Sequence, residues 1–337
     1  MKIDAALFTT DLLGCEARAA KLEAQGFSAA WSVEGQHDPF LPLALAARGT
    51  HHLELGTAIA VAFARNPMTC AQVAWDLQAL SQGRFILGLG TQIRPHIEKR
   101  FSQPWSRPAA RMREFALAVR AIWGCWGGGE KLDFRGEFYT HTLMTPFFQP
   151  GPLPSGPPRL FLAGVGPKLT EVAGEVADGF LVHPFHSPAF LRAETLPALL
   201  RGLARSGRTR ADLAVSCQTI VAMGANAEQI ETARQKARGQ ISFYGSTPSY
   251  KGVLEHHGRP TLQPELNRLS KQGRWAEMLG LVDDELFDAI AVSGTPAEVG
   301  RRLRERNAGF ADRTTLMLYD ETGDPDAVVD LIRGATS

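Results

Sequence analysis

Short apolar or β-branched runs alternate with amphipathic segments along most of the chain. A regular alternation of this kind predicts strands and helices in turn. The clearest helix is expected over 109–126, where Phe115, Val119, Ile122 and Trp123 share one helical face. The apolar runs predict eight strands, over 3–8, 28–33, 53–61, 85–89, 160–163, 180–183, 214–222 and 315–319.

Helices are expected between these strands, and strands that alternate with helices form parallel sheets covered by those helices. The other helical segments are predicted over 12–25, 42–48, 69–80, 168–177, 189–205, 227–239, 274–281 and 296–306. Eight strand–helix units favour a closed α/β fold, a (β/α)8 TIM barrel, over an open doubly wound sheet. The open sheet also lacks its usual fingerprint, because Gly88-Leu89-Gly90 is not followed by a third glycine that opens a helix.

Three excursions interrupt the alternation, over 90–108, 127–158 and 243–269. The second contains a Gly-Gly-Gly turn, a probable strand pair around 133–139, and six prolines between Pro146 and Pro158. Dense proline is typical of extended loops on a surface. We therefore expect one barrel domain over 1–337, with insertions after the fourth and seventh strands.

The composition is that of a globular protein with almost no net charge, and so without a strong overall electrostatic field. The 337 residues are 44% hydrophobic and 21% charged, enough for a large core. Lysine plus arginine (36) nearly balances aspartate plus glutamate (35), which leaves a formal charge of +1. This balance argues against nucleic acid or an anionic membrane as a partner, so any anion site must be local.

Cysteine usage and the N-terminus suggest a cytoplasmic protein. Cys15, Cys70, Cys125 and Cys217 are scattered, with no Cys-x-x-Cys pair, as expected for reduced thiols. The first residues run directly into an apolar strand and lack the features of a signal peptide. No apolar run is long enough to span a bilayer.

Two sequence blocks stand at the third and fourth strands: Gly-Thr-Ala-Ile-Ala-Val-Ala-Phe-Ala-Arg-Asn-Pro over 56–67 and Gly-Arg-Phe-Ile-Leu-Gly-Leu-Gly-Thr over 83–91. They resemble the luciferase-like monooxygenase superfamily, particularly its coenzyme F420-dependent branch. The resemblance continues through 34–40, 111–114, 162–167, 177–180 and 294–299, and so covers nearly the whole chain. Residues 244–269 are the part without a match.

The resemblance implies an oxidoreductase that binds coenzyme F420, a deazaflavin, or alternatively FMN, over the mouth of the barrel. The F420 branch passes a hydride between the cofactor and a small organic substrate, here unidentified. The rival is a two-component monooxygenase that uses reduced FMN from a separate reductase. A noncatalytic cofactor-binding barrel is the alternative of another class. The family also implies a homodimer and a non-prolyl cis peptide, at Thr57-Ala58 or Ala58-Ile59, which would press on the cofactor ring.

Glu34 and His37 lie just beyond the second strand, where a barrel carries catalytic groups. His37 is a candidate acid or base because an imidazole titrates near neutrality. F420-dependent sugar-phosphate dehydrogenases have an Asp-His pair in the corresponding loop. Gly35 and Gln36 occupy those positions here, so the proton donor does not transfer from the family.

The fourth strand leads into Gly90, Thr91, Gln92 and His96. Gly90 permits close approach of backbone to a ligand, and Gly90 and Thr91 also match the family block. The basic residues that follow could bind an anionic cofactor tail, or they could simply form a solvated charged loop. We take Gly90, Thr91, Gln92 and His96 as candidate cofactor contacts.

Gly164-Val165-Gly166 stands between the fifth strand and a helix that begins near Pro167. Small residues at a helix N-terminus leave backbone N–H groups free to bind phosphate. A tight turn without a ligand would look the same, but the family match favours the phosphate of the cofactor. His183 ends the sixth strand and is a further candidate contact. We predict no metal site, because the sequence has no cluster of ligands.

Overall fold

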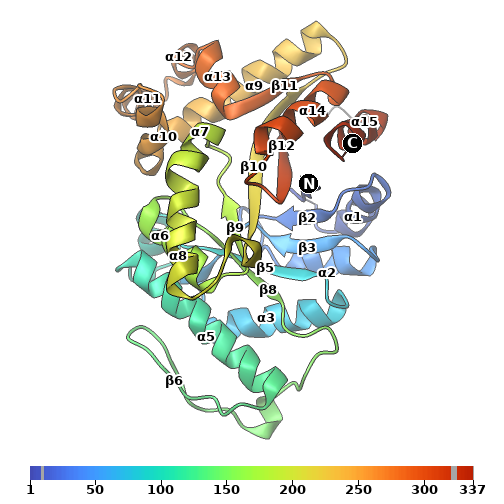
Figure 1. Ribbon diagram of the computed structural model, residues 1–337, viewed down its shortest axis with the longest axis vertical. Helices are drawn as coiled ribbons and strands as arrows, with labels where there is room; N and C mark the ends of the chain where they lie inside the picture. Colours follow the sequence, from blue (N-terminus) through green and yellow to red (C-terminus); the bar gives the residue numbers. More distant parts are fainter. Residues whose placement is uncertain (9–10, 320–324, 337) are drawn as a thin grey trace.

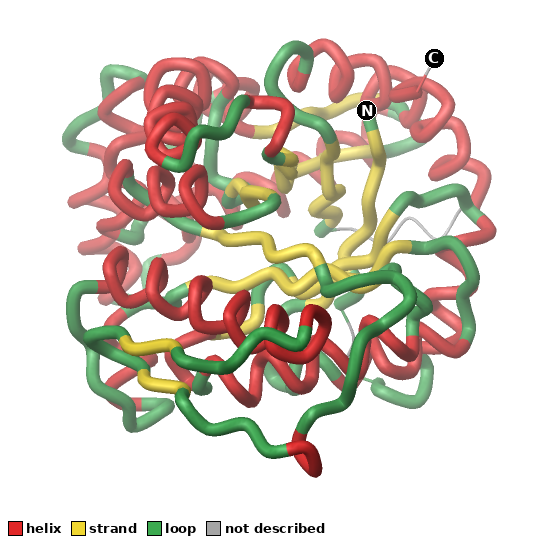
Figure 2. Tube along the Cα trace, turned by 60° about the horizontal axis from the view of Figure 1, so that its bottom comes forward, coloured by secondary structure: helices red, strands yellow, loops and turns green. Residues whose placement is uncertain are grey.

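A closed ring of eight parallel strands forms the centre of the computed structural model, which describes residues 1–8, 11–319 and 325–336 (Figures 1 and 2). The ring confirms the predicted (β/α)8 barrel. In ring order its strands are β1 (Lys2–Ala6), β2 (Ala29–Ser32), β3 (Glu54–Thr57), β5 (Phe85–Gly90), β8 (Arg159–Ala163), β9 (Gly179–Val182), β10 (Ala214–Met223) and β12 (Arg313–Leu318).

β10 closes the ring because it pairs on both sides. Cys217 lies opposite Val182 of β9 and opposite Thr314 of β12. The C-terminal half of β10 also pairs with β11 (Ala291–Gly294), a strand that the sequence did not predict. β11 is only four residues long and lies between two helices, so it offers too short a pattern to distinguish a strand from a helix end.

The third predicted strand, over 53–61, is interrupted. It forms β3 and then β4 (Ala60–Val61), which pairs with β5. The peptide bond between Ala58 and Ile59 is cis, at one of the two predicted places.

The predicted helices surround the ring. They are α1 (Cys15–Ala24), α2 (Leu41–Arg48), α3 (Pro67–Leu80), α5 (Pro108–Gly128), α6 (Pro167–Val176), α8 (Leu196–Arg205), α9 (Ala227–Gly245), α12 (Trp275–Gly280) and α14 (Pro296–Asn307). α15 (Pro325–Thr336) packs on α14 close to the N-terminal strand (Figure 1). Caps mark several boundaries: the Asn66 side chain accepts from the Thr69 N–H, and Thr295 and Glu298 form a capping box.

The three excursions differ in structure. Residues 90–108 contain α4 (Arg94–Lys99), and 127–158 contain an antiparallel hairpin, β6 (Phe134–Arg135) and β7 (Thr140–His141), as predicted for 133–139. Residues 243–269 are helical: α9 runs six residues beyond its expected end at 239, and α10 (Lys251–His256) and α11 (Leu262–Lys271) follow. α10, α11 and α13 (Asp284–Ile290) are orange helices at the top left of Figure 1, and the yellow α9 lies beside them.

Large apolar side chains fill the inside of the barrel. Trp31, Ile86, Phe161 and Leu181 form one buried cluster, with the Trp31 and Phe161 ring centroids 5.9 Å apart. Trp31, Trp75, Trp123 and Trp126 are all buried, and the four cysteines are buried free thiols. The barrel is therefore a packed core, and any ligand must bind at its end.

An ionic network lies at the end of the barrel where the strands begin. Arg313 donates to both Asp4 oxygens, at 2.5 and 2.9 Å, and lies 2.8 Å from Glu54. Arg159 binds the other Glu54 oxygen at 2.6 Å. Burial raises the pKa of Glu54, but the charges of Arg313 and Arg159 outweigh burial and bring that pKa to about 2. The network ties four strands together at the end opposite the candidate site.

Candidate functional site

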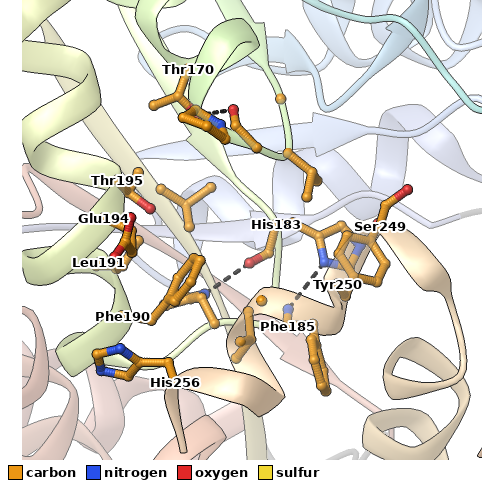
Figure 3. A pocket seen from close by; sticks show the side chains of 18 of the residues that line it. Thr170, His183, Phe185, Phe190, Leu191, Glu194, Thr195, Ser249, Tyr250 and His256 are labelled. Atoms are coloured by element: carbon orange, nitrogen blue, oxygen red, sulfur yellow. Dashed lines mark hydrogen bonds between the residues drawn. The ribbon is translucent and has the colours of Figure 1, made fainter. Parts of the chain in front are cut away.

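A cavity of about 420 Å³ opens where β8 and β9 end (Figure 3). One side consists of the loop after β8 and the first turns of α6. The other sides come from α7 (Pro188–Phe190), a π-helical turn over Leu191–Thr195, and residues 249–256. In Figure 3, Glu194 and Thr195 lie across the cavity from Ser249 and Tyr250. π-helical turns often occur at functional sites, and this one brings Glu194 to the cavity rim.

The glycine loop Gly164–Val165–Gly166 lines the cavity at the N-terminus of α6. Gly166 has φ +87°, a conformation that favours glycine, and no atom lies within 4 Å of where its Cβ would be. The first N–H groups of a helix have no carbonyl partner within that helix. α6 is ten residues long, so these groups and its dipole can together bind an anion here.

His183 lines the same cavity with a fixed imidazole. Its Nδ1 accepts the Phe185 N–H at 3.1 Å, so the proton of the neutral ring lies on Nε2. The ring stacks on Tyr250, with centroids 4.3 Å apart, and meets the edge of Tyr244 at 4.7 Å. Burial lowers the pKa of His183 to about 3. The residue is therefore a neutral Nε2–H donor at physiological pH.

His186 is a second buried imidazole beside the cavity. Its Nδ1 lies 2.8 Å from the His183 carbonyl oxygen and donates to it, whereas its Nε2 has no partner among the described residues. Burial, together with the nearby Arg306 charge, lowers the pKa of His186 to about 3. Arg306 lies behind it and donates to the carbonyls of His186 and Ile290. His186 therefore offers a ligand an acceptor, not a charge.

The loop after β2 is held from two sides. Glu34 accepts from Arg65 at 2.6 Å and from the Val61 N–H at 2.7 Å, and Arg65 also binds Asp38 at 3.0 Å. Arg100, just after α4, donates to the Gly35 carbonyl at 3.0 Å. His37 is half-buried in this loop. The loops after β2 and β5 therefore meet, although neither lines the 420 Å³ cavity.

Thr57 and Gly88 join β3 to β5 beside the cis peptide. The Thr57 hydroxyl donates to the Gly88 carbonyl at 2.7 Å and accepts the Gly88 N–H at 2.9 Å, so it is fully engaged. A Cβ on Gly90 would come within 2.9 Å of Ile59 Cγ1, so Gly90 makes room for Ile59. Ala58 is half-buried at the same level.

The remaining predicted contacts follow β5. Thr91 and Gln92 are half-buried, and their polar atoms form local bonds: the Thr91 hydroxyl to the Gln92 carbonyl at 2.9 Å, and the Gln92 side chain to the Ile93 N–H at 3.0 Å. His96 is exposed on α4. None of the three lines the cavity.

The predicted site residues thus fall into two groups, and only one of them lines the cavity. Gly164, Val165, Gly166 and His183 share the cavity, whereas the others lie around the ends of β2, β3 and β5. The cavity also includes residues that the sequence did not single out as ligand contacts, and most belong to 190–195 and 249–256. The adjacent histidines at 256 and 257 differ in environment. His257 is half-buried, with Nε2 2.8 Å from the Ser187 hydroxyl, whereas His256 is exposed.

Neither a metal-ligand cluster nor a membrane-spanning helix is found among the described residues. No group of three or more histidine, cysteine, aspartate or glutamate residues among them could hold a metal ion. Of the helices in the same ranges, none combines the length and apolar character needed to cross a bilayer.

Several known proteins are similar to this chain in sequence. An uncharacterized protein of Mycobacterium tuberculosis is 58% identical over 295 residues, which are 88% of this chain and 87% of that protein. A 5,10-methylenetetrahydromethanopterin reductase of Archaeoglobus fulgidus is 27% identical over 293 residues, with 84% and 82% of the two chains covered.

Solved structures share the fold. The coenzyme F420-dependent tetrahydromethanopterin reductase of Methanopyrus kandleri gives a TM-score of 0.80 at 19% identity, covering 98% of this chain and 96% of that one. The oxygenating constituent of a Pseudomonas putida diketocamphane monooxygenase, in complex with FMN, gives 0.68 at 15% identity over 98% and 97%. The sequence itself matches the luciferase-like monooxygenase family over residues 11–313. The chain therefore belongs to that family of oxidoreductases.

Proposed function

We propose that this protein transfers a hydride between coenzyme F420 and a small organic substrate. The observation that supports this function most is the cavity at the end of β8 and β9, where a glycine loop, a helix N-terminus and a neutral imidazole converge. A relative named as a methylenetetrahydromethanopterin reductase, and a similar fold in an F420-dependent reductase, make this the first choice over FMN.

The residues present suit a phosphate-bearing cofactor. The glycine loop has open space at Gly166, and the first turn of α6 offers free N–H groups beside it. At the barrel mouth, Ala58 is half-buried and has a small side chain, so a flat ring could lie against the backbone there. When bound, the reduced deazaflavin would supply the hydride.

The chain itself would supply positioning and a proton. Arg65 and the Val61 N–H already hold the Glu34 carboxylate, so we assign Glu34 to fixing the loop. His37 lies in the same loop, and its side chain has no such hydrogen-bond or ion-pair partners among the described residues. We propose its imidazole as the acid or base at the substrate. Thr57, Thr91, Gln92 and His96 remain predicted contacts.

Cofactor titration tests the proposal. Purified protein is titrated separately with F420 and FMN, and oxidation of reduced F420 is followed during a substrate screen. Tight F420 binding with substrate-dependent oxidation supports the proposal. Tight FMN binding without F420 binding would favour the rival monooxygenase. Binding without any turnover across a broad screen would favour a noncatalytic role.

Gly166→Asp should weaken F420 binding at least about tenfold, or ~1.4 kcal/mol, because it puts a carboxylate where phosphate is expected. Aspartate is also strained at this φ, so the control is Gly207→Asp. Gly207 has φ +68° with open space, in the turn after α8. Calorimetric titration of both folded variants separates the two effects: equal binding by both would remove the glycine loop from the site.

His37→Ala should slow turnover about 100-fold, within the range of a lost general acid or base, and should change the dissociation constant of F420 little. His52→Ala is the control, because His52 is exposed in the turn before β3, at the other end of the barrel. Stopped-flow measurement of hydride transfer checks this prediction. An unchanged rate in His37→Ala would exclude His37 from the chemistry.

A further inference from the structure

The cavity has no basic side chain in its lining, which is unusual for a phosphate site. Its lining includes neither lysine nor arginine, and the only charged carboxylates are Glu194 and Glu255 at the rim. Phosphate dianions are usually bound by arginine or lysine, because those side chains offset the charge as well as donate hydrogen bonds.

The donors among the lining residues are neutral. The glycine loop and α6 contribute backbone N–H groups, and His183 contributes an imidazole whose proton lies on Nε2. The pKa values of His183 and His186 lie at about 3 because of burial, so neither ring gains a charge near neutrality. These groups can solvate a negative charge but not cancel it.

The nearby cations are engaged or lie outside the lining. Lys251 pairs with Glu255 at 2.8 Å, and Arg306 donates to two backbone carbonyls behind His186. Lys168 is exposed on α6 and does not line the cavity. Glu194 is exposed at the rim, and no ion pair to it is found in the described part of the chain. His256 also lies at the rim, exposed and with its ring edge-to-face against Phe190.

We propose that this cavity selects a ligand phosphate with a single negative charge, a phosphodiester, over a dianionic phosphomonoester. Neutral donors suffice for one charge, whereas a second charge would meet the uncompensated carboxylate of Glu194. The inference rests on the proposed function, which places the phosphate of the cofactor here. It also separates the two cofactors, because F420 carries a phosphodiester and FMN a phosphomonoester.

The charge of FMN can be changed without changing its shape. Its phosphate passes from monoanion to dianion around the second pKa of about 6, so titrations at about pH 5.5 and about pH 8 compare the two forms. The control ligand is riboflavin 4′,5′-cyclic phosphate, a phosphodiester that keeps one charge throughout. We expect FMN to bind about tenfold more weakly at the higher pH, or ~1.4 kcal/mol, and the cyclic diester to change little.

The diester also controls for changes of charge on the protein. If such a change caused the pH dependence, both ligands would bind more tightly at low pH, and that result would contradict the inference. Equal FMN affinity at the two pH values would contradict it as well.

Two substitutions test the charges directly at the higher pH. Glu194→Gln removes the free carboxylate, and Val165→Lys adds a cation to the glycine loop, where Val165 is 41% exposed. Each should tighten FMN binding severalfold more than diester binding. Glu98→Gln is the matched control, because Glu98 lies on α4 in an exposed pair with Arg94. Equal effects on both ligands would overturn the assignment.

The outcomes also distinguish the two proposals. F420-dependent turnover with pH-independent FMN binding would retain the function and overturn the charge selection. Binding of neither F420 nor any flavin phosphate would overturn both.

Discussion

Replacing Arg313 with methionine is expected to lower the free energy of unfolding by about 3–5 kcal/mol at neutral pH, because a buried carboxylate loses its partner. Asp4 is fully buried, and apart from Arg313 its side chain is bound by the Trp31 Nε1–H, at 3.0 Å. Methionine fills a similar volume but leaves this charge uncompensated. Urea denaturation of the purified variant measures the loss.

The pH dependence of that loss has a definite sign. Burial raises the pKa of Asp4 even though Arg313 acts against it, so removing Arg313 raises this pKa further. A carboxyl with a higher pKa in the folded than in the unfolded state stabilises the fold once it is protonated. The deficit of Arg313→Met should therefore shrink as pH falls through the raised pKa.

The double variant Asp4→Asn with Arg313→Met is the control. An asparagine oxygen can still accept the Trp31 N–H, and no buried charge remains. Most of the lost stability should return. A double variant as unstable as Arg313→Met would mean that methionine disturbs the packing around Trp31, over which Arg313 lies at 5.2 Å.

Gly88→Ala should destabilise the barrel by at least about 3 kcal/mol, at the upper end of the cost of overpacking. A Cβ at this position would lie 1.8 Å from the Thr57 carbonyl oxygen and 2.9 Å from a Leu181 methyl group. The oxygen belongs to backbone immediately before Ala58, so the strand end itself must move. Denaturant unfolding of the Gly88→Ala variant measures the loss of stability, and F420 titration of the folded variant measures any loss of cofactor binding.

Gly239→Ala provides the contrast. Gly239 lies within α9, and no atom is found within 4 Å of where its Cβ would be. Alanine in a helix interior is more favourable than glycine by up to about 1 kcal/mol, so this variant should be neutral or more stable. Similar losses in both variants would mean that the close contact at Gly88 is relieved by small shifts.

The barrel could be predicted because its strands are apolar and regularly spaced. The eight runs over 3–8 to 315–319 all occur as ring strands, with shifts of a few residues at their ends. β11 and the break between β3 and β4 were not predictable. Four residues of pattern cannot identify a strand, and the break lies within a continuous apolar run.

The site was only partly predictable, for a different reason. Gly164, Gly166 and His183 follow strands directly, so their place at the barrel end follows from the count of strands. Glu194 and Tyr250 reach the cavity through a π-helical turn and a helical insertion, and neither has a local pattern that indicates a ligand. Thr57 stays a predicted contact, and the two hydrogen bonds between its hydroxyl and the Gly88 backbone are a pairing between strands that no local pattern reveals.

The stacking of Tyr250 on His183 joins the helical insertion to the end of β9. Tyr250 packs with Val253 and Leu254 in a hydrophobic cluster that includes Ile220 and Ala222 of β10 but is distinct from the cluster of Trp31 and Phe161. One wall of the cavity can therefore vary during evolution while the barrel that supports it stays constant. Ligand preference in related chains could diverge through this wall alone, and an exchange of residues 248–256 between homologues offers protein engineers a way to redirect the site.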